Sequence, residues 1–234
     1  MYKLTAKYYD KIYYWKDYEK ESEKIKSLIK NYKKSDGNEM LDVACGTGSH
    51  IPYLKDQFNI TGLDLDKDML NEAGKKLPGI KFVTGDMRTF KLKKKFDVIV
   101  CLFSAIAYMH TQAQLQKAIK NFSDHLKQGG LMIIEGFIPP KEFKPDLVHG
   151  IYFNEPHLKI FRATKATKKG HLMTMDFHIL VADKKEVKYI NEKHIAAMYE
   201  DKVFLNIMKK ENLISVCIKD GFMKGRSLFL GIKN

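Results

Sequence analysis

The sequence lacks any long apolar run. No stretch approaches the ~20 residues that a membrane-spanning helix needs, and the first residues are polar and aromatic, unlike those of a signal peptide. The three cysteines, Cys45, Cys101 and Cys217, show no CxxC spacing and lie in or beside apolar runs. Such cysteines indicate neither a disulfide framework nor a metal centre and are typical of a reducing compartment. We expect a cytoplasmic protein with no membrane partner and no bound metal.

Arginine clusters interleaved with aromatic residues, which favour nucleic-acid binding, are also absent. The net charge of +13 comes mostly from lysines that are dispersed over residues 24–34, 91–95 and 165–169. Dispersed lysine is typical of a solvated surface, so the charge alone does not favour a nucleic-acid partner. The same field would attract a phosphorylated or carboxylated small substrate.

The length and the order of apolar runs indicate one α/β domain. A chain of 234 residues with 44% hydrophobic residues can bury one sizeable core with an insertion, but hardly two independent cores. Predicted strands alternate with predicted helices in the first part of the chain. The strands are 40–44, 60–64, 80–84, 96–102 and 131–135, and the helices are 48–56, 67–77 and 112–126. This alternation predicts a doubly wound, mostly parallel sheet with helices on both faces.

Two segments fall outside that alternation. A tyrosine-dense stretch at 7–15 and a helical pattern at 17–32 predict an N-terminal helical lid within residues 1–35. Between residues 140 and 200, three extended runs predict an antiparallel β insertion over the active site, at 158–166, 172–181 and 187–195. A helix at 201–211 and strands at 213–219 and 226–232 then return to the main sheet. The expected fold is a single domain, 1–234, with a Rossmann-like, doubly wound seven-stranded sheet.

The most informative motif is a small-residue turn with two glycines, LDVACGTGSH at residues 41–50. A buried strand enters this turn, a helix leaves it, and Asp64 closes the next apolar run. Glycines let the backbone approach a ligand closely, and a carboxylate at the second strand end can accept hydrogen bonds from a ribose diol. The pattern therefore predicts a βαβ unit that binds a nucleoside.

The details of the turn disfavour two common nucleotide ligands. Ile51 stands where a G-x-G-x-x-G turn has its third glycine, and no Gly-Lys-Ser/Thr follows to meet a triphosphate, so neither NAD nor ATP is favoured. Gly85-Asp86-Met87-Arg88 follows the third strand, so three strand ends could share one ligand. Two alternatives remain open: the glycines could serve only tight packing, and Asp64 could cap the next helix, although Asp66 is better placed to do so.

With these motifs, the chain resembles class I S-adenosylmethionine-dependent methyltransferases over nearly its whole length. More narrowly, it is similar to the N,N-dimethyltransferases that act on nucleotide-linked amino sugars in the desosamine and mycaminose pathways. The glycine turn is specific only for the superfamily. The narrower similarity rests on YDKIY at 9–13, FSAIAY at 103–108 and GRSLF at 225–229. The resemblance implies S-adenosyl-L-methionine as cofactor, methyl transfer to an amine or hydroxyl of a small molecule, and a homodimer.

The resemblance also implies roles for individual residues. Tyr13 and Lys16 would close over the cofactor or the acceptor. The predicted contacts of the cofactor are Ala44, Gly46 and Gly48 with its methionine part, Asp64 with its ribose, and Asp86 and Met87 with its adenine. Leu102, Phe103 and Ser104 would form the floor between cofactor and acceptor, and the remaining predicted cofactor contacts are Cys45, Leu65 and Met69. Arg226 would meet a sugar hydroxyl or a diphosphate oxygen of the acceptor, whereas without the resemblance a surface arginine explains it equally well.

Methyl transfer from a sulfonium requires no nucleophilic residue, because the methyl group is already activated and the enzyme mainly holds the acceptor in line. The predicted catalytic residues are Tyr13, Tyr108, Glu135 and Arg226. Tyr108 stands where the sugar enzymes commonly carry a histidine. As a proton acceptor Glu135 is favoured over His178, which we expect to face one side of the insertion sheet. The aromatic residues expected in an acceptor-selecting lid are Tyr13, Tyr14, Trp15, Phe137, Tyr152 and Phe177.

Two other functions remain open from the sequence. An RNA or protein methyltransferase with the same core is favoured only by the charge. The fourth strand ends in Cys101-Leu102-Phe103-Ser104 instead of the Asn/Asp-Pro-Pro-Tyr/Phe of enzymes that methylate base nitrogens. A non-catalytic, cofactor-binding partner subunit is disfavoured because the glycine turn and both strand-end aspartates are intact.

Overall fold

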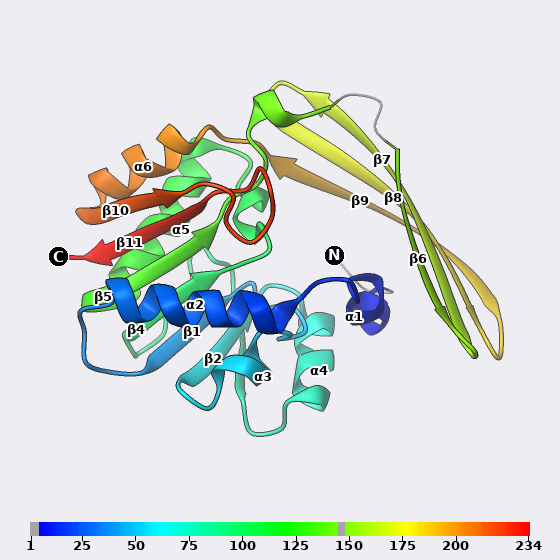
Figure 1. The fold of residues 1–234 in the computed structure, drawn as a ribbon, viewed down its shortest axis with the longest axis horizontal. Helices are drawn as coiled ribbons and strands as arrows, with labels where there is room; N and C mark the ends of the chain where they lie inside the picture. Colours follow the sequence, from blue (N-terminus) through cyan, green and yellow to red (C-terminus); the bar gives the residue numbers. More distant parts are fainter. Residues whose placement is uncertain (1–4, 145–147) are drawn as a thin grey trace.

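The main sheet of the protein is a seven-stranded, mostly parallel sheet. The computed structural model describes residues 5–144 and 148–234 (Figure 1). In chain order the strands are β1 (Glu39–Val43), β2 (Asn59–Asp64), β3 (Lys81–Thr84), β4 (Phe96–Cys101), β5 (Leu126–Glu135), β10 (Leu213–Ile218) and β11 (Leu228–Lys233). They lie in the order β10-β11-β5-β4-β1-β2-β3, and only β11 runs antiparallel to its neighbours β5 and β10. The predicted doubly wound seven-stranded sheet is confirmed.

Helices bury both faces of this sheet. The helices that flank it are α2 (Tyr18–Tyr32), α3 (Ile51–Leu54), α4 (Lys67–Lys76), α5 (Gln112–His125) and α6 (Asp201–Lys210). Leu41 and Val43 of β1 pack in one core with Phe122 of α5 and Phe204 of α6. Met40, one residue along, packs in a second core with α2 and α3. Because successive strand residues point to opposite faces, a continuous apolar run such as β4 is buried on both sides.

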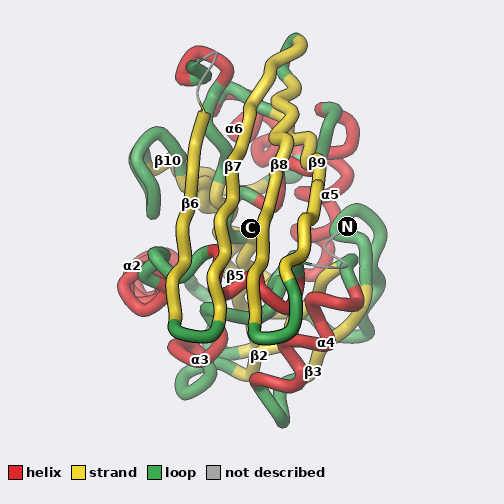
Figure 2. Tube along the Cα trace, turned by 90° about the vertical axis from the view of Figure 1, so that its right-hand side faces the viewer, coloured by secondary structure: helices red, strands yellow, loops and turns green. Residues whose placement is uncertain are grey.

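A second sheet of four antiparallel strands stands apart from the first (Figure 1), and Figure 2 shows it face-on. Its strands are β6 (Val148–Glu155), β7 (Leu158–Lys169), β8 (Leu172–Asp183) and β9 (Val187–Ala197), paired in chain order. One face packs against the N-terminal segments η1 (Ala6–Tyr8) and α1 (Tyr9–Ile12), through a cluster that joins Tyr8 and Ile12 to Phe153, Phe177 and Ile179. We call this four-stranded sheet the insertion sheet and that face its inner face.

Several elements differ from the expected ones, and β5 begins at Leu126 instead of residue 131. The helix expected at 48–56 is reduced to α3, because Gly48 has a φ of +71° and belongs to the turn, and Pro52 fits only the first helical turn. The strand β6 was not predicted, since Gly150 weakens its alternating pattern. The last strand begins at Leu228 instead of residue 226, because the backbone N–H of Arg226 donates to the carbonyl of Met223 in a turn.

The parallel strands bring several chain segments to one edge. The chain leaves β1 toward β2 and β3 and then returns to β4 on the other side of β1, which creates a topological switch point at the carboxyl ends of β1 and β4. Ligands of such sheets bind beyond these ends. Among the described residues, no helix has the length and apolar character needed to cross a membrane.

Candidate active site

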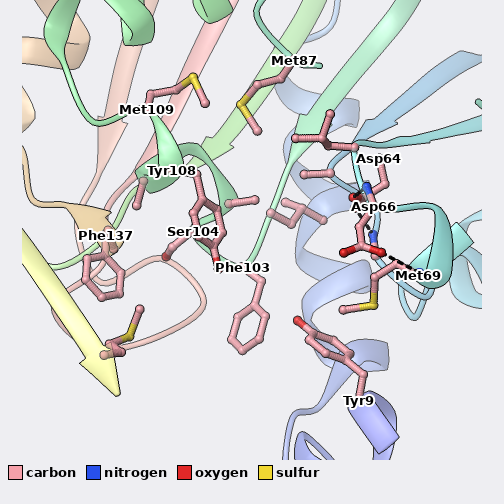
Figure 3. A pocket seen from close by; sticks show the side chains of 18 of the residues that line it. Tyr9, Asp64, Asp66, Met69, Met87, Phe103, Ser104, Tyr108, Met109 and Phe137 are labelled. Carbon is pink, nitrogen blue, oxygen red and sulfur yellow. Dashed lines mark hydrogen bonds between the residues drawn. The ribbon is translucent and has the colours of Figure 1, made fainter. Parts of the chain in front are cut away.

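A cavity of about 700 Å³ lies at this switch point, between the main sheet, α1 and the insertion sheet. Residues that follow β1, β2, β3 and β4 line one side of it, and the inner face of the insertion sheet lines the other. Figure 3 shows Asp64 and Asp66 at one end of the cavity, Ser104 and Phe137 at the other, and Phe103 between them. We call the end with Ser104, Tyr108, Phe137 and Arg226 the outer chamber.

The two glycines of the turn, Gly46 and Gly48, are required for different structural reasons. Gly46 has a φ of +56°, and a Cβ placed on it would meet no atom of the described residues within 4 Å, so its backbone leaves open space for a ligand. A Cβ on Gly48 would lie 2.9 Å from the side chain of Leu77 and 3.1 Å from that of Ile51. Tight packing therefore explains Gly48 but not Gly46.

Asp64 is held at the end of β2 by the turn itself. Its Oδ2 accepts a hydrogen bond from the backbone N–H of Gly46 at 2.8 Å, and its Oδ1 accepts one from that of Asp66 at 2.8 Å (Figure 3). Burial raises the pKa of Asp64, while these backbone hydrogen bonds lower it. Asp66, not Asp64, caps α4, by accepting from the N–H groups of Asp68 and Met69. The capping alternative for Asp64 is thereby excluded.

A second carboxyl group, that of Asp42, lies buried beneath the turn. Its residue is 4% exposed, and burial, followed by the charge of Asp64, raises its pKa to about 8. Asp42 is therefore mostly protonated at pH 7 in the folded chain, whereas it is ionised in the unfolded chain. It lines a smaller pocket that adjoins the cavity.

This buried carboxyl makes stability depend on pH. Between about pH 4 and pH 8 the folded state binds more protons at Asp42 than the unfolded state, so its contribution to stability is complete at low pH and is lost as the pH rises through about 8. We expect Asp42→Asn to flatten the pH dependence of the unfolding free energy by up to about 1.4 kcal/mol per pH unit in that range. Urea unfolding of both proteins from pH 5 to pH 8 measures this, and parallel curves would show that Asp42 is ionised when folded.

After β3, Asp86 is paired with Arg88. The Nε of Arg88 lies 2.9 Å from Oδ1 of Asp86, and this pairing lowers the pKa of the carboxyl group. Both residues line the cavity together with the buried Met87. The strand end thus presents one carboxylate whose charge is already balanced.

Phe103 is placed across the cavity by an unusual backbone. Phe103 and Ser104 have φ values of +50° and +58°, in the left-handed region that favours glycine, and such strain is concentrated at functional sites. The N–H of Phe103 donates to Oε2 of Glu135 at 2.6 Å, and the hydroxyl of Ser104 donates to the carbonyl of Gly136 at 2.6 Å. These two hydrogen bonds to the end of β5 hold the strained turn in place.

Glu135 lies behind this turn as a buried countercharge. It is 0% exposed, its Oε1 has no hydrogen-bond partner among the described residues, and Nη1 of Arg226 lies 3.9 Å away. Burial raises the pKa of Glu135, and the charges of Arg226 and Lys16 lower it. Arg226 also lies over the rings of Phe137 and Phe103, at 5.2 and 5.9 Å from their centres.

Tyr108 enters the outer chamber from the short helix η2 (Ala105–Tyr108). Its hydroxyl lies 2.8 Å from Nδ1 of His194 on β9, and the other nitrogen of that imidazole lies 3.4 Å from Glu192. An imidazole is therefore present beside Tyr108, supplied by the insertion sheet.

Most of the residues predicted for the site do line the cavity. These are Tyr13, Ala44, Gly46, Asp64, Leu65, Met69, Asp86, Met87, Leu102, Phe103, Tyr108 and Arg226. Cys45 lines the smaller adjoining pocket, and Lys16, Gly48 and Glu135 line neither. Lys16 is buried in an ion pair with Glu21 and lies over the ring of Phe103, 4.6 Å from its centre.

Some of the aromatic residues expected in the lid line the cavity and others do not. Tyr13, Trp15, Phe137 and Phe177 line the cavity. Tyr152 is exposed instead, because it alternates with the buried Phe153 on β6, and the Tyr14 hydroxyl donates to the Tyr152 carbonyl. His178 is exposed on the insertion sheet, as its alternation with Phe177 predicts.

Sequence reasoning missed several lining residues, notably Tyr9, Arg88, Arg162 and Thr164. Tyr9 and Arg88 lie in two of the sequence motifs described above, although those motifs gave neither residue a role. Arg162 carries a usable signal, since arginine is rare in this chain.

Comparisons with known proteins cover both sheets. A family described as a methyltransferase domain matches residues 40–130. The dTDP-3-amino-3,4,6-trideoxy-alpha-D-glucopyranose N,N-dimethyltransferase of Streptomyces venezuelae is 32% identical, over 93% of this chain and 92% of that protein. The dTDP-3-amino-3,6-dideoxy-alpha-D-glucopyranose N,N-dimethyltransferase of Streptomyces fradiae is 30% identical, over 93% of this chain and 85% of that protein.

Solved structures of related methyltransferases also match nearly the whole chain. The crystal structure of Streptomyces venezuelae DesVI matches with a TM-score of 0.88 and 30% identity, over 94% of this chain and 93% of that one. The structure of CalS10 with bound S-adenosylmethionine, an amino pentose methyltransferase from Micromonospora echinaspora, matches with a TM-score of 0.83 and 28% identity, over 94% and 92% of the two chains. Matches of this extent include the insertion sheet as well as the main sheet.

Proposed function

Because the chain belongs to the class I S-adenosylmethionine-dependent methyltransferases, in the family of the amino-sugar N,N-dimethyltransferases, we propose that it methylates the amine of a nucleotide-linked amino sugar. The observation that carries this proposal is the extent of the match, 94% of the chain at a TM-score of 0.88. The part of the cavity that the cofactor core does not build, its insertion-sheet side, is therefore shared with a sugar-methylating family. The core alone would indicate only the cofactor.

The residues at the switch point fit S-adenosylmethionine, the cofactor of this family. The open space over Gly46 allows close approach of a ligand, and Asp64 offers a carboxylate at the end of β2. We propose that Asp64 holds the ribose hydroxyls, that Ala44 and Gly46 border the methionine part, and that Asp86 and Met87 border the adenine. When bound, the cofactor supplies an activated methyl group on a sulfonium.

The outer chamber would position the acceptor amine. An amine attacks only when it is neutral, and a chamber bordered by the rings of Phe103 and Phe137 disfavours the ammonium form by desolvation. We assign Tyr13 and Tyr108 to orienting the acceptor and Arg226 to contacting it, with Glu135 balancing the charge of Arg226. Residues 1–35 and 140–200 would act as a lid over this chamber, since both contribute lining side chains.

Methyl-group uptake from labelled S-adenosylmethionine tests the proposal directly. The acceptors to compare are nucleotide-linked amino sugars, the free amino sugars, simple amines, phenols and RNA. We expect product with an amino sugar and none with RNA. Tight binding of the cofactor without product on any acceptor would favour a non-catalytic partner subunit instead.

Contacts of Asp10 join α1 to the glycine turn and to α4, and we call them the Asp10 latch. Asp10 of α1 accepts hydrogen bonds from the hydroxyls of Thr47 at 2.5 Å and Ser49 at 3.0 Å, and it pairs with Nζ of Lys76 on α4 at 2.7 Å. Asp10→Ala would release α1, which carries Tyr9 over the cavity, so we expect affinity for S-adenosylhomocysteine to fall by about 10-fold. Calorimetry measures this, with Glu23→Gln on α2 as the control, and equal affinities would show that α1 does not cover the cofactor.

We also propose that the protein is a cytoplasmic homodimer, joined through the outer face of the insertion sheet. Tyr152, Phe161, Leu180 and Tyr189 are exposed and opposite one another in register, so they form one row across all four strands. We expect Phe161→Glu to convert the dimer to a monomer in sedimentation experiments, and a wild-type protein that sediments as a monomer would contradict the assignment.

The free cysteines support the proposed location in a reducing compartment, which cell fractionation tests.

A further inference from the structure

Arginine is rare in this chain, and its positions are informative. Of 41 lysines and arginines, only Arg88, Arg162 and Arg226 are arginines, and all three line the cavity. The guanidinium group differs from the lysine ammonium group in presenting a planar fork of N–H donors that matches carboxylate and phosphate. Arginine in this protein is therefore concentrated where such donors can meet a ligand.

Among the residues that the structure describes, only one of the three guanidinium groups lacks a countercharge. Arg88 pairs with Asp86, and Arg226 lies 3.9 Å from Glu135. Within residues 5–144 and 148–234, Arg162 has no ion-pair partner, and its Nε is buried without a hydrogen bond. Arg162 is 7% exposed, and a buried cation without a partner is costly.

The surroundings of Arg162 hold it in place and add further donors. Its guanidinium group lies between two rings, 5.1 Å from the centre of Tyr13 and 4.8 Å from that of Phe177. Thr164 lies two residues along β7 on the same face, and its hydroxyl is also buried without a partner among the described residues. His149 of β6 is opposite Thr164 in register, and all three residues line the cavity. We call Arg162, Thr164 and His149 the Arg162 patch.

We propose that the Arg162 patch binds the phosphoryl groups of the acceptor, that is, the diphosphate of a nucleotide-linked sugar. This inference rests on the proposed function. A diphosphate presents oxygens in several directions, which suits donors from two strands, whereas the guanidinium fork alone satisfies a carboxylate. The ring of Tyr13 contacts both Arg162 and Phe103, whose ring centre lies 5.0 Å from that of Tyr13. A diphosphate at the patch would therefore keep the attached sugar next to Phe103 and the outer chamber.

Calorimetry with three probes tests this assignment on the full chain: thymidine diphosphate, inorganic pyrophosphate and thymidine. We expect Arg162→Met to weaken binding of thymidine diphosphate by about 10- to 100-fold and to leave binding of thymidine unchanged. Arg162→Lys keeps the charge but loses the fork, so it should recover only part of the affinity. Thr164→Val should also weaken binding of thymidine diphosphate, but by a smaller factor than Arg162→Met.

Lys165→Met is the matched control, because it removes a positive charge from an exposed residue of the same strand. It should leave all three affinities within about twofold. Unchanged melting temperature and S-adenosylhomocysteine affinity identify variants that fold. If Arg162→Met does not fold, the affinities of Arg162→Lys and Thr164→Val for thymidine diphosphate decide the test.

The outcomes separate this inference from the proposed function. Equal affinity of the wild-type protein and the Arg162 variants for thymidine diphosphate would overturn it and leave Arg162 as a packing residue between two rings. A wild-type protein that binds neither thymidine diphosphate nor pyrophosphate but methylates a free amino sugar would also overturn it, with the methyltransferase activity intact. Arg162-dependent binding of thymidine diphosphate without methylation of any amino sugar would support the patch and contradict the proposed function.

Discussion

Asp64→Ala is expected to weaken binding of S-adenosylhomocysteine by about 10²- to 10⁴-fold. A carboxylate that accepts two hydrogen bonds from a diol contributes about 1.5 to 3 kcal/mol for each bond. The substitution also leaves the N–H groups of Gly46 and Asp66 without their acceptor, so the turn that approaches the ligand loses its anchor. Calorimetry on both proteins measures the change.

Two further variants make the Asp64 prediction specific. Asp64→Asn keeps the shape and one acceptor oxygen, so it should fall between the wild-type protein and Asp64→Ala. Glu72→Gln removes a carboxylate from α4 whose partner is Lys75, and it should leave the affinity unchanged. If Asp64→Ala bound S-adenosylhomocysteine as tightly as the wild-type protein does, the assignment of the ribose to the end of β2 would be wrong.

Arg226→Met is expected to lower the free energy of unfolding by about 3 kcal/mol and to abolish methyl transfer. The substitution leaves Glu135, which is 0% exposed, with a buried charge and only the more distant Lys16 to balance it. Removing one partner of a buried ion pair costs more than removing both. Urea unfolding measures the stability, and labelled methyl transfer measures the activity.

The double variant Glu135→Gln/Arg226→Met separates the two effects. It should recover most of the lost stability, because no unbalanced charge remains. It should not recover activity, because the contact that we propose between Arg226 and the acceptor is still missing. Lys219→Met, which breaks an exposed ion pair with Asp201, serves as the control and should change neither quantity. Full recovery of activity in the double variant would show that Arg226 acts only on stability.

The strand-end side of the cavity, where we propose that the cofactor binds, was predictable from sequence because it is built from strand ends. Asp64 and Asp86 each follow an apolar run, and parallel strands bring such ends to one edge of a sheet. The capping role of Asp66 was predictable for a similar reason, since it depends on the local sequence before α4. Local pattern and sheet topology together suffice for these positions.

The outer chamber was less predictable because its residues meet only through long-range packing. Glu135 lies at the expected strand end, yet the backbone of Phe103 turns across it, so the carboxylate is buried behind that residue. His194 reaches Tyr108 from 86 positions along the chain. Neither contact has a periodic signature. The first depends on the path of the backbone after β4, and the second depends on how β9 packs against η2.

If α1 covers the bound cofactor as we propose, the contacts of Asp10 should also affect product release. The Asp10 and Lys76 side chains are 43% and 35% exposed, so dissolved ions can screen their attraction. If lid opening limits turnover, a higher ionic strength should speed product release, and stopped-flow measurements across a salt series would detect it. The ionic strength inside a cell would then set both how tightly the product is retained and how fast the enzyme turns over.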